Sequence, residues 1–275
     1  MFFKLQPIIY TAIFFLALEI LAFQQGWFFQ IALFLFIYSI IIIWPLARKI
    51  RYLAFPLFLS LGSFSLLFFI DSFLEKQVFI FMAGGVYYLA LLGSYRLKFY
   101  SCDQTAQGML NLVTIASMFF WFLAIYAWFL NYVFAFWLLP IIIFLSTAFV
   151  SIPSLIVCST DREKIQKKIK EKKEKKKFFG NQVLEIIYHE NRRSIIFLDL
   201  ILALFVAQFA WVVSYWPFSY LTLGTVLLIV FYIAWDIIRN FIQGKLSLKR
   251  LVMNGLMATL FVIAIVSTAQ WDLVV

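Results

Sequence analysis

The stretch FFWFLAIYAWFLNYVFAFWLLP, from Phe119 to Pro140, contains no charged side chain. The uncharged segment continues in both directions, from Gln104 to Thr160, which is long enough for two membrane crossings of about 20 residues each. Asn131, near the middle, is a natural position for a turn. The stretch therefore predicts a hairpin of two membrane-spanning helices joined by a very short connection.

The composition of the whole chain extends this interpretation. Of the 275 residues, 65% are hydrophobic and only 13% are charged, which is far from the balance of a soluble globular protein. Lipid must therefore surround most of the chain. Because lipid cannot hydrogen-bond to free backbone groups, the spans must be helices or a closed barrel, and the alternating pattern of barrel strands is absent. The expected fold class is all-α, a polytopic transmembrane helix bundle.

Nine apolar runs are long enough to cross a bilayer. The expected spans are 5–23, 27–47, 53–70, 78–94, 105–129, 133–157, 195–215, 218–238 and 251–270. The first run resembles a signal peptide, but it carries Glu19 and leads directly into a second span, so we expect an uncleaved first helix. The expected organisation is one membrane domain with spans 1–6 in residues 1–157, a polybasic helical loop at 158–194, and spans 7–9 in residues 195–275.

The basic residues predict the orientation. Of the 23 lysine and arginine residues, all but Lys76 fall on one side of such a threading. Since basic residues accumulate on the cytoplasmic side, the N-terminus and the 158–194 loop are predicted to be cytoplasmic and the C-terminus outside. We expect a plasma-membrane protein, in a bacterial inner membrane.

The segment DREKIQKKIKEKKEKKKFFG, Asp161 to Gly180, holds ten basic and four acidic residues. Thr160 and Glu163 have the spacing of a capping box, which predicts that a new helix starts there, ends at Gly180, and is followed by a second helix from Asn181. The segment is either a solvated connector or attached to anionic lipid. Nucleic acid is a less favoured partner because no aromatic platform accompanies the charge. The residues expected at the membrane surface are Lys167, Lys168, Lys172, Lys173, Lys175, Lys176 and Lys177.

Polar residues inside the spans are candidates for binding. Glu19 has no partner nearby in sequence, so it either serves a polar pathway or is bonded to a Ser, Tyr or Gln of another span. Asn111, Thr114 and Ser117 share one side of the fifth span, with Gln107 a turn earlier. This side either lines a pathway or forms hydrogen bonds to a neighbouring helix.

Asp199 and Asp236 are weak catalytic candidates. Two facing carboxylates could share a proton and activate water. The number of spans and the long loop are similar to those of presenilin-type intramembrane proteases, but FLDL and AWDI lack the Gly-x-Gly-Asp motif and the last span lacks Pro-Ala-Leu. The favoured account is interfacial ion pairing, with Arg192 or Arg193 for Asp199 and with Arg239 for Asp236.

Several other chemistries are excluded by the residues present. The single histidine, His189, rules out a two-histidine metal site within one chain, and no nucleotide-binding glycine motif occurs. No metal or cofactor is expected. Cys102 and Cys158 are expected to be reduced thiols. Every lysine is expected in a connection between spans, which argues against a Schiff-base cofactor of rhodopsin type.

Proline and small residues predict bends and close helix contacts. Pro140 and Pro153 both fall inside the sixth expected span and should each break one backbone hydrogen bond. Small faces for helix packing are expected at Ser60/Gly62/Ser63, at Gly84-Gly85 and at Gly255/Thr259.

Three functions stay open on this basis. The first is transport or handling of a small apolar or lipid-like solute, the second a non-enzymatic scaffold or assembly partner for a membrane protein, and the third an intramembrane enzyme that uses Asp199 and Asp236.

Overall fold

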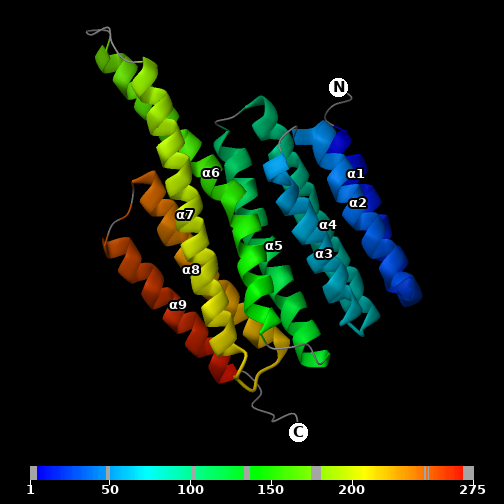
Figure 1. Cartoon of the computed structure of the whole chain (residues 1–275). Helices are drawn as coiled ribbons and strands as arrows, with labels where there is room; N and C mark the ends of the chain where they lie inside the picture. Colours follow the sequence, from blue (N-terminus) through cyan, green and yellow to red (C-terminus); the bar gives the residue numbers. More distant parts are fainter. Residues whose placement is uncertain are drawn as a thin grey trace.

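The structure, a computed structural model, describes residues 5–47, 50–100, 103–132, 137–174, 181–244, 246 and 248–268 (Figure 1). Within these ranges the chain is all-helical, with long helices that run alternately up and down the bundle. The long helices are α1 (Gln6–Phe23), α2 (Phe28–Ala47), α3 (Ala54–Phe68), α4 (Phe73–Phe99), α5 (Gln104–Asn131), α6 (Leu138–Glu174), α7 (Asn181–Val213), α8 (Tyr220–Gln243) and α9 (Leu248–Thr268). Two short 3-10 turns, η2 (Gln25–Trp27) and η3 (Ile50–Leu53), precede α2 and α3.

Each expected span overlaps one of these helices, so the prediction of helices at those positions is confirmed. Six of them are long and apolar enough to cross a membrane, by length and composition. They are α1, α4, α5, the Leu138–Cys158 part of α6, the Ser194–Val213 part of α7, and α8. Shorter apolar segments lie at Phe28–Ile42, Ala54–Phe68 and Leu251–Ile265. The six long helices indicate association with a membrane.

The start of α4 differs from the prediction. The helix begins at Phe73, five residues before the expected span, and it includes Lys76 in its first turn and Lys98 in its last. The expectation that every lysine lies in a connection is therefore wrong. The acidic Glu75 in the same turn favours an early start, because negative charge near a helix N-terminus is stabilising.

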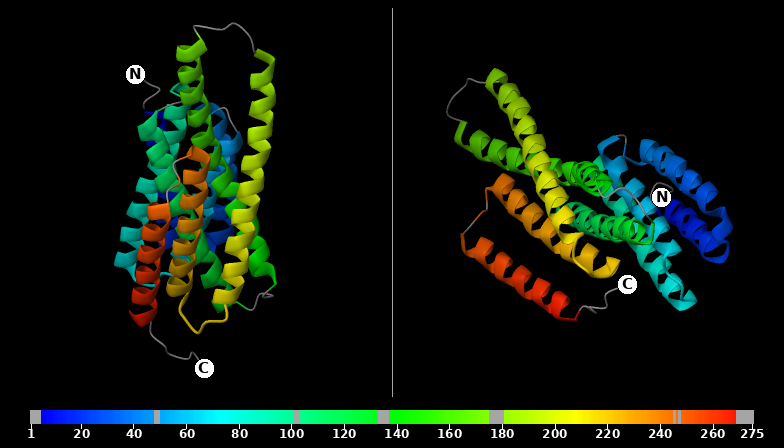
Figure 2. Two further views of the ribbon diagram at one scale, coloured as in Figure 1. Left: turned by 90° about the vertical axis from the view of Figure 1, so that its left-hand side faces the viewer. Right: turned by 60° about the horizontal axis from the view of Figure 1, so that its bottom comes forward.

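The helices around the polybasic segment are continuous. α6 runs without a break through Thr160 and Glu163, and α7 runs without a break from Asn181 into the apolar residues beyond Ser194 (Figure 2). The predicted helix start at Thr160 is wrong. The predicted stop at Gly180 lies outside the described residues, and the helix expected from Asn181 is the first part of α7 rather than a separate helix. Between Ser154 and Glu174 the sequence contains no glycine or proline and is rich in Lys, Glu and Ile, so nothing terminates the helix.

The two prolines of α6 have different positions. Pro153 lies inside the helix as predicted. Pro140 instead falls in the first turn, because α6 starts at Leu138. A proline in the first turn removes no intrahelical hydrogen bond, so only Pro153 interrupts the backbone ladder of α6.

α5 lies at the centre of the bundle and packs against α3, α4, α6 and α8. Two glycines allow close approach to it. A Cβ on Gly62 of α3 would lie 3.2 Å from the backbone of Phe120, and a Cβ on Gly224 of α8 would lie 3.1 Å from the backbone nitrogen of Leu123 and 2.5 Å from its Cδ2. The predicted packing face at Gly62 is confirmed, and Gly224 is an additional one.

The other two predicted packing faces differ in whether another side chain contacts them. Gly84 packs against the ring of Phe15, where a Cβ would lie 3.2 Å from the ring, whereas Gly85 has no atom near enough to meet a Cβ. Gly255 of α9 likewise has nothing within 4 Å among the described residues, so the prediction of a packing face there is wrong. α9 lies at the edge of the bundle beside α8 (Figure 2, right), and most of its large apolar side chains are exposed.

Aromatic rings fill the end of the bundle where α3 ends and α5 reaches Asn131. The ring of Trp128 stacks on Phe68 at 5.9 Å and on Tyr132 at 4.8 Å, and it meets Phe28 and Phe69 edge-on or tilted at 6.0 and 5.3 Å. These rings link α2, α3 and α5 at this end of the bundle.

Candidate functional site

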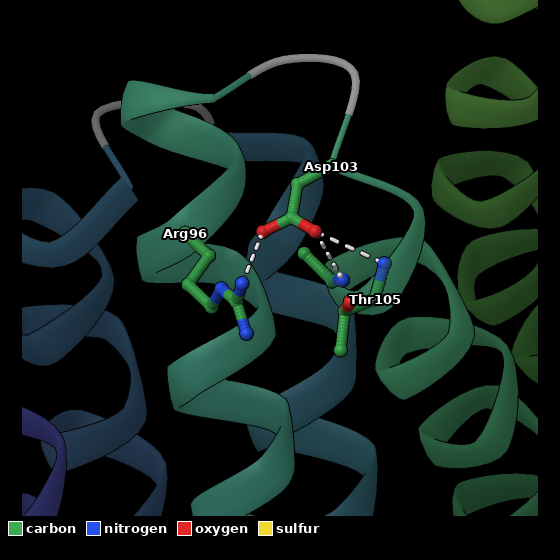
Figure 3. Close-up of polar contacts among 4 residues, drawn as sticks. Arg96, Asp103 and Thr105 are labelled. Atoms are coloured by element: carbon green, nitrogen blue, oxygen red, sulfur yellow. Dashed lines mark hydrogen bonds and ion pairs between the residues drawn. The ribbon is translucent and has the colours of Figure 1, made fainter.

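The first turn of α5 is fixed to α4 by Asp103. One carboxylate oxygen of Asp103 accepts hydrogen bonds from the backbone N–H groups of Thr105 and Ala106, at 3.0 and 3.4 Å (Figure 3). The other oxygen lies 2.7 Å from a guanidinium nitrogen of Arg96, near the end of α4. Asp103 thus caps α5 and sets its position against α4. The polar side chains of α5 lie in the turns that come after Asp103.

The polar side of α5 points into the bundle. Thr114 and Ser117 are fully buried. The Thr114 hydroxyl donates to the Leu110 carbonyl at 2.8 Å, and the Asn111 amide oxygen accepts from Ser154 of α6 at 3.2 Å. The alternative of hydrogen bonding to a neighbouring helix is therefore confirmed for Asn111. Gln107, a turn nearer the start of α5, is half-buried.

α6 carries a matching set of small polar residues that the sequence reasoning missed. Thr147, Ser151, Ser154 and Cys158 are all buried, and their spacing of four, three and four residues places them on one side of the helix. Their helical spacing within an apolar run was the available signal. The Ser151 hydroxyl contacts both the Thr147 carbonyl, at 2.6 Å, and the carboxylate of Asp199 on α7.

Asp199 is completely buried and hydrogen-bonded to Ser151. This contact differs from the predicted ion pair with Arg192 or Arg193, whose side chains lie outside the described part of the structure. The residue is nearest to α6 because the buried side of α7 faces that helix, with Ile195 and Leu202 a turn away on either side. The second carboxylate oxygen, Oδ2, has no hydrogen-bond partner among the described residues.

The three helices bring these groups to one level. α5 and α7 run in the same direction, and the Tyr126 hydroxyl donates to the Ala210 carbonyl at 2.9 Å. Counting back the same number of residues from this contact leads to Asp199 on α7 and to Ile115 on α5. Because the two helices run in the same direction, Asp199 lies level with the part of α5 between Thr114 and Ser117. We call the resulting set of side chains the polar stripe: Asn111 and Thr114 of α5, Thr147, Ser151 and Ser154 of α6, and Asp199 of α7.

Asp236 is bonded elsewhere. Its Oδ2 accepts hydrogen bonds from Asn240 and from Asn254 of α9, each at 2.8 Å. Arg239, its predicted ion partner, instead places its guanidinium 5.3 Å from the centre of the Trp235 ring. No interaction joins Asp199 and Asp236 in the described ranges, so the structure does not bring the two catalytic candidates together.

Glu19 belongs to a different contact. Its carboxylate accepts a hydrogen bond from the Gln77 amide of α4 at 3.0 Å, which confirms the expectation of a Ser, Tyr or Gln partner from another span. This contact joins α1 to α4. Glu19 and the polar stripe therefore lie in different parts of the bundle.

A pocket of about 440 Å³ opens between the start of the apolar part of α7 and the end of α8. Its lining is mostly apolar and combines buried and exposed side chains. The lining residues are Ser194, Ile195, Leu198, Phe241, Ile242, Gly244 and Leu246. The volume is within the range of small-molecule sites, roughly 300–1,000 Å³. Sequence reasoning missed this pocket, since it depends on which helices are neighbours.

The structure describes little of the expected membrane-surface residues. Lys167, Lys168, Lys172 and Lys173 lie on the helical backbone of α6, but their side chains are outside the described part of the structure, as are Lys175, Lys176 and Lys177 entirely. Among the described residues, no three His, Cys, Asp or Glu side chains are grouped so as to hold a metal ion.

Fold and site together define an all-helical protein with six helices long and apolar enough to cross a membrane. Residues 182–268, which comprise nearly all of α7 with α8 and α9, match a family model described as "Protein of unknown function (DUF5656)". No curated protein and no solved structure matched the chain. The pocket lies within the matched residues, whereas most of the polar stripe lies outside them.

Proposed function

We propose that this chain is a nine-span membrane protein that binds a lipid-like molecule with an anionic headgroup, as part of its transport or handling. In this proposal the N-terminus and the α6–α7 extension are cytoplasmic and the C-terminus is outside, in the plasma membrane of a bacterium. The excess of basic residues on one side supports the orientation. The start of α1 and the extension lie at the same end of the bundle, as this orientation requires (Figure 1).

The pocket between α7 and α8 is the observation that carries the proposal. Ile195 and Ile242 form buried apolar walls, while Phe241 and Leu246 are exposed at the rim. An open apolar pocket beside exposed apolar helix surface suits an acyl chain that enters from the bilayer, rather than a polar solute that enters from water.

The basic residues near the pocket favour a lipid with an anionic headgroup. Arg239 lies about one turn before Ile242 on α8, and further basic residues flank the pocket in sequence, namely Arg192, Arg193, Lys245, Lys249 and Arg250. Each basic residue near a membrane surface contributes about 1 kcal/mol to the attraction of anionic lipid. The lysines of the polybasic segment would add a second, less specific contact with the same leaflet. Neutralising Lys167, Lys168, Lys172 and Lys173 to Gln should then weaken, but not abolish, retention of phosphatidylglycerol by the detergent-solubilised protein.

The test is the amount of lipid that the purified, detergent-solubilised protein retains when it is offered phosphatidylglycerol or phosphatidylcholine. The wild-type chain should retain phosphatidylglycerol preferentially. Leu198→Trp should abolish that preference because the larger ring fills the pocket. Arg239→Gln should weaken phosphatidylglycerol retention roughly fivefold, as expected from the loss of about 1 kcal/mol.

A matched control is Leu200→Trp, which places the same ring on an exposed position of α7 outside the pocket. It should leave lipid retention unchanged. Equal retention of both lipids by the wild-type chain, or an equal loss in both tryptophan variants, would contradict the proposal.

A further inference from the structure

The polar stripe contains buried oxygens with no partner. Asp199 Oδ2 and Thr147 Oγ1 are without hydrogen bonds among the described residues, and both side chains are fully buried. Thr147 lies one turn from Ser151 on the same side of α6, and Ser151 bonds to Asp199. Buried polar atoms are rarely left without a partner, so two oxygens beside the same serine point to a ligand that bonds to oxygen.

The ligand at these oxygens must also neutralise the negative charge of Asp199. The charged and titratable groups around it are few. On α6 the nearest is the buried thiol of Cys158, and on α5 it is the Tyr126 hydroxyl, which is bonded to Ala210. On α8 they are Arg239, which is packed on Trp235, and Asp236, which is bonded to Asn240 and Asn254. No described side chain forms an ion pair with Asp199. A buried carboxylate is strongly unfavourable in an apolar bundle unless a cation pairs with it.

The stripe also has a direction. Ser151, which bonds to Asp199, lies at its level. One turn nearer the end of the bundle that carries the α6–α7 extension, Ser154 of α6 bonds to Asn111 of α5. In the other direction α5 continues with Phe120 and Phe122, which are buried in the apolar core. The stripe therefore ends near Thr147 and connects Asp199 to one side only.

We propose that Asp199 binds a proton inside the bundle and that the polar stripe is the route by which water brings it from the end that carries the α6–α7 extension. The proton occupies Oδ2, while Oδ1 stays bonded to the Ser151 hydroxyl. Since the stripe does not continue past Thr147, this is a proton-binding site with access from one side. It does not depend on the lipid pocket between α7 and α8.

Infrared spectroscopy of the full chain in detergent tests this directly, because a protonated carboxyl has a carbonyl band that an ionised one lacks. At neutral pH the wild-type protein should show such a band from a buried carboxyl. Asp199→Asn should remove it, and the matched variant Asp236→Asn should retain it. Ser151→Ala should shift the band to higher frequency, because the carboxyl loses its hydrogen-bond partner.

The route is tested by transfer into D₂O, which shifts the band as deuterium replaces the proton. Asn111→Leu should slow this shift at least several-fold, whereas Leu112→Asn, on the exposed side of the same turn, should not change it. An unchanged carboxyl region in Asp199→Asn would overturn the proposal, since the residue would then be ionised. If that variant does not fold, a band unaffected by Ser151→Ala overturns it equally.

Discussion

Asp103 acts at the residue scale, because one side chain both caps α5 and contacts Arg96 of α4. Asp103→Ala removes both interactions. Loss of the cap should cost about 1 kcal/mol. The ion pair should add at most about 1 kcal/mol, since Arg96 is 39% exposed. The unfolding free energy of the detergent-solubilised protein should therefore fall by about 1–2 kcal/mol in denaturant titration.

Asp103→Asn separates the two contributions. Asn is as good an N-cap as Asp, so this variant keeps the hydrogen bonds to the first turn of α5 and loses only the charge. It should be clearly more stable than Asp103→Ala. Equal destabilisation by both variants would show that the contact with Arg96, rather than the cap, fixes α5 to α4.

Single residues also show what the sequence could predict of the candidate site. The types of partner for Glu19 were predictable, because a carboxylate within an apolar helix needs a hydrogen-bond donor. The partner of Asp199 was not, since Ser151 lies 48 residues away and only the packing of α6 on α7 brings them together. Local sequence suggested Arg192 and Arg193 instead, because they precede Asp199 by only one to two turns of the same helix.

At the scale of elements, Gly224 determines how closely α8 approaches α5. Gly224→Ala places a methyl group 3.1 Å from a backbone atom of Leu123, which cannot move without the helix. The overpacking should cost about 1–3 kcal/mol, more than the roughly 1 kcal/mol gained from the higher helix propensity of alanine. The thermal unfolding midpoint in detergent should therefore fall.

Gly255→Ala is the matched control on α9, where a Cβ meets nothing within 4 Å. This variant should leave the midpoint unchanged or raise it slightly. A fall as large as that of Gly224→Ala would contradict the close-approach explanation.

These two glycines also show how far the spacing of small residues in the sequence predicts contacts between helices. Gly255 and Thr259 match the small-xxx-small spacing, yet that face of α9 packs against no described residue. Gly224 lacks a small partner at that spacing and still forms the tightest contact. Apolar length predicted where each helix lies, whereas the helix ends depended on local stop signals. The Lys- and Glu-rich segment after Cys158 has none, so α6 continues through a predicted boundary.

At the scale of the whole molecule, the proposed orientation in the membrane can be tested. With Cys102 and Cys158 replaced by alanine, Lys170→Cys in the extension of α6 and Tyr215→Cys between α7 and α8 should lie on opposite sides of the membrane. A membrane-impermeant maleimide added to intact cells should therefore modify only Tyr215→Cys. Tyr215 is 71% exposed, so its accessibility is not limited by burial.

Permeabilised cells provide the control, because both cysteines should then react equally. Modification of Lys170→Cys in intact cells would reverse the proposed orientation. That the start of α1 and the α6–α7 extension lie at the same end of the bundle could be anticipated from the basic residues, but which helices are neighbours could not. The central position of α5 and the edge position of α9 follow from side-chain fit between segments far apart in sequence.

The central position of α5 has a consequence for biosynthesis. α1 to α4 contribute most of one core and are made before α5, so that core has nearly all its residues once α5 has been made. The surface of α5 around Leu123 receives Gly224 only when α8 has been made, about a hundred residues later. A chain truncated before α8 therefore leaves this surface of the middle helix uncovered.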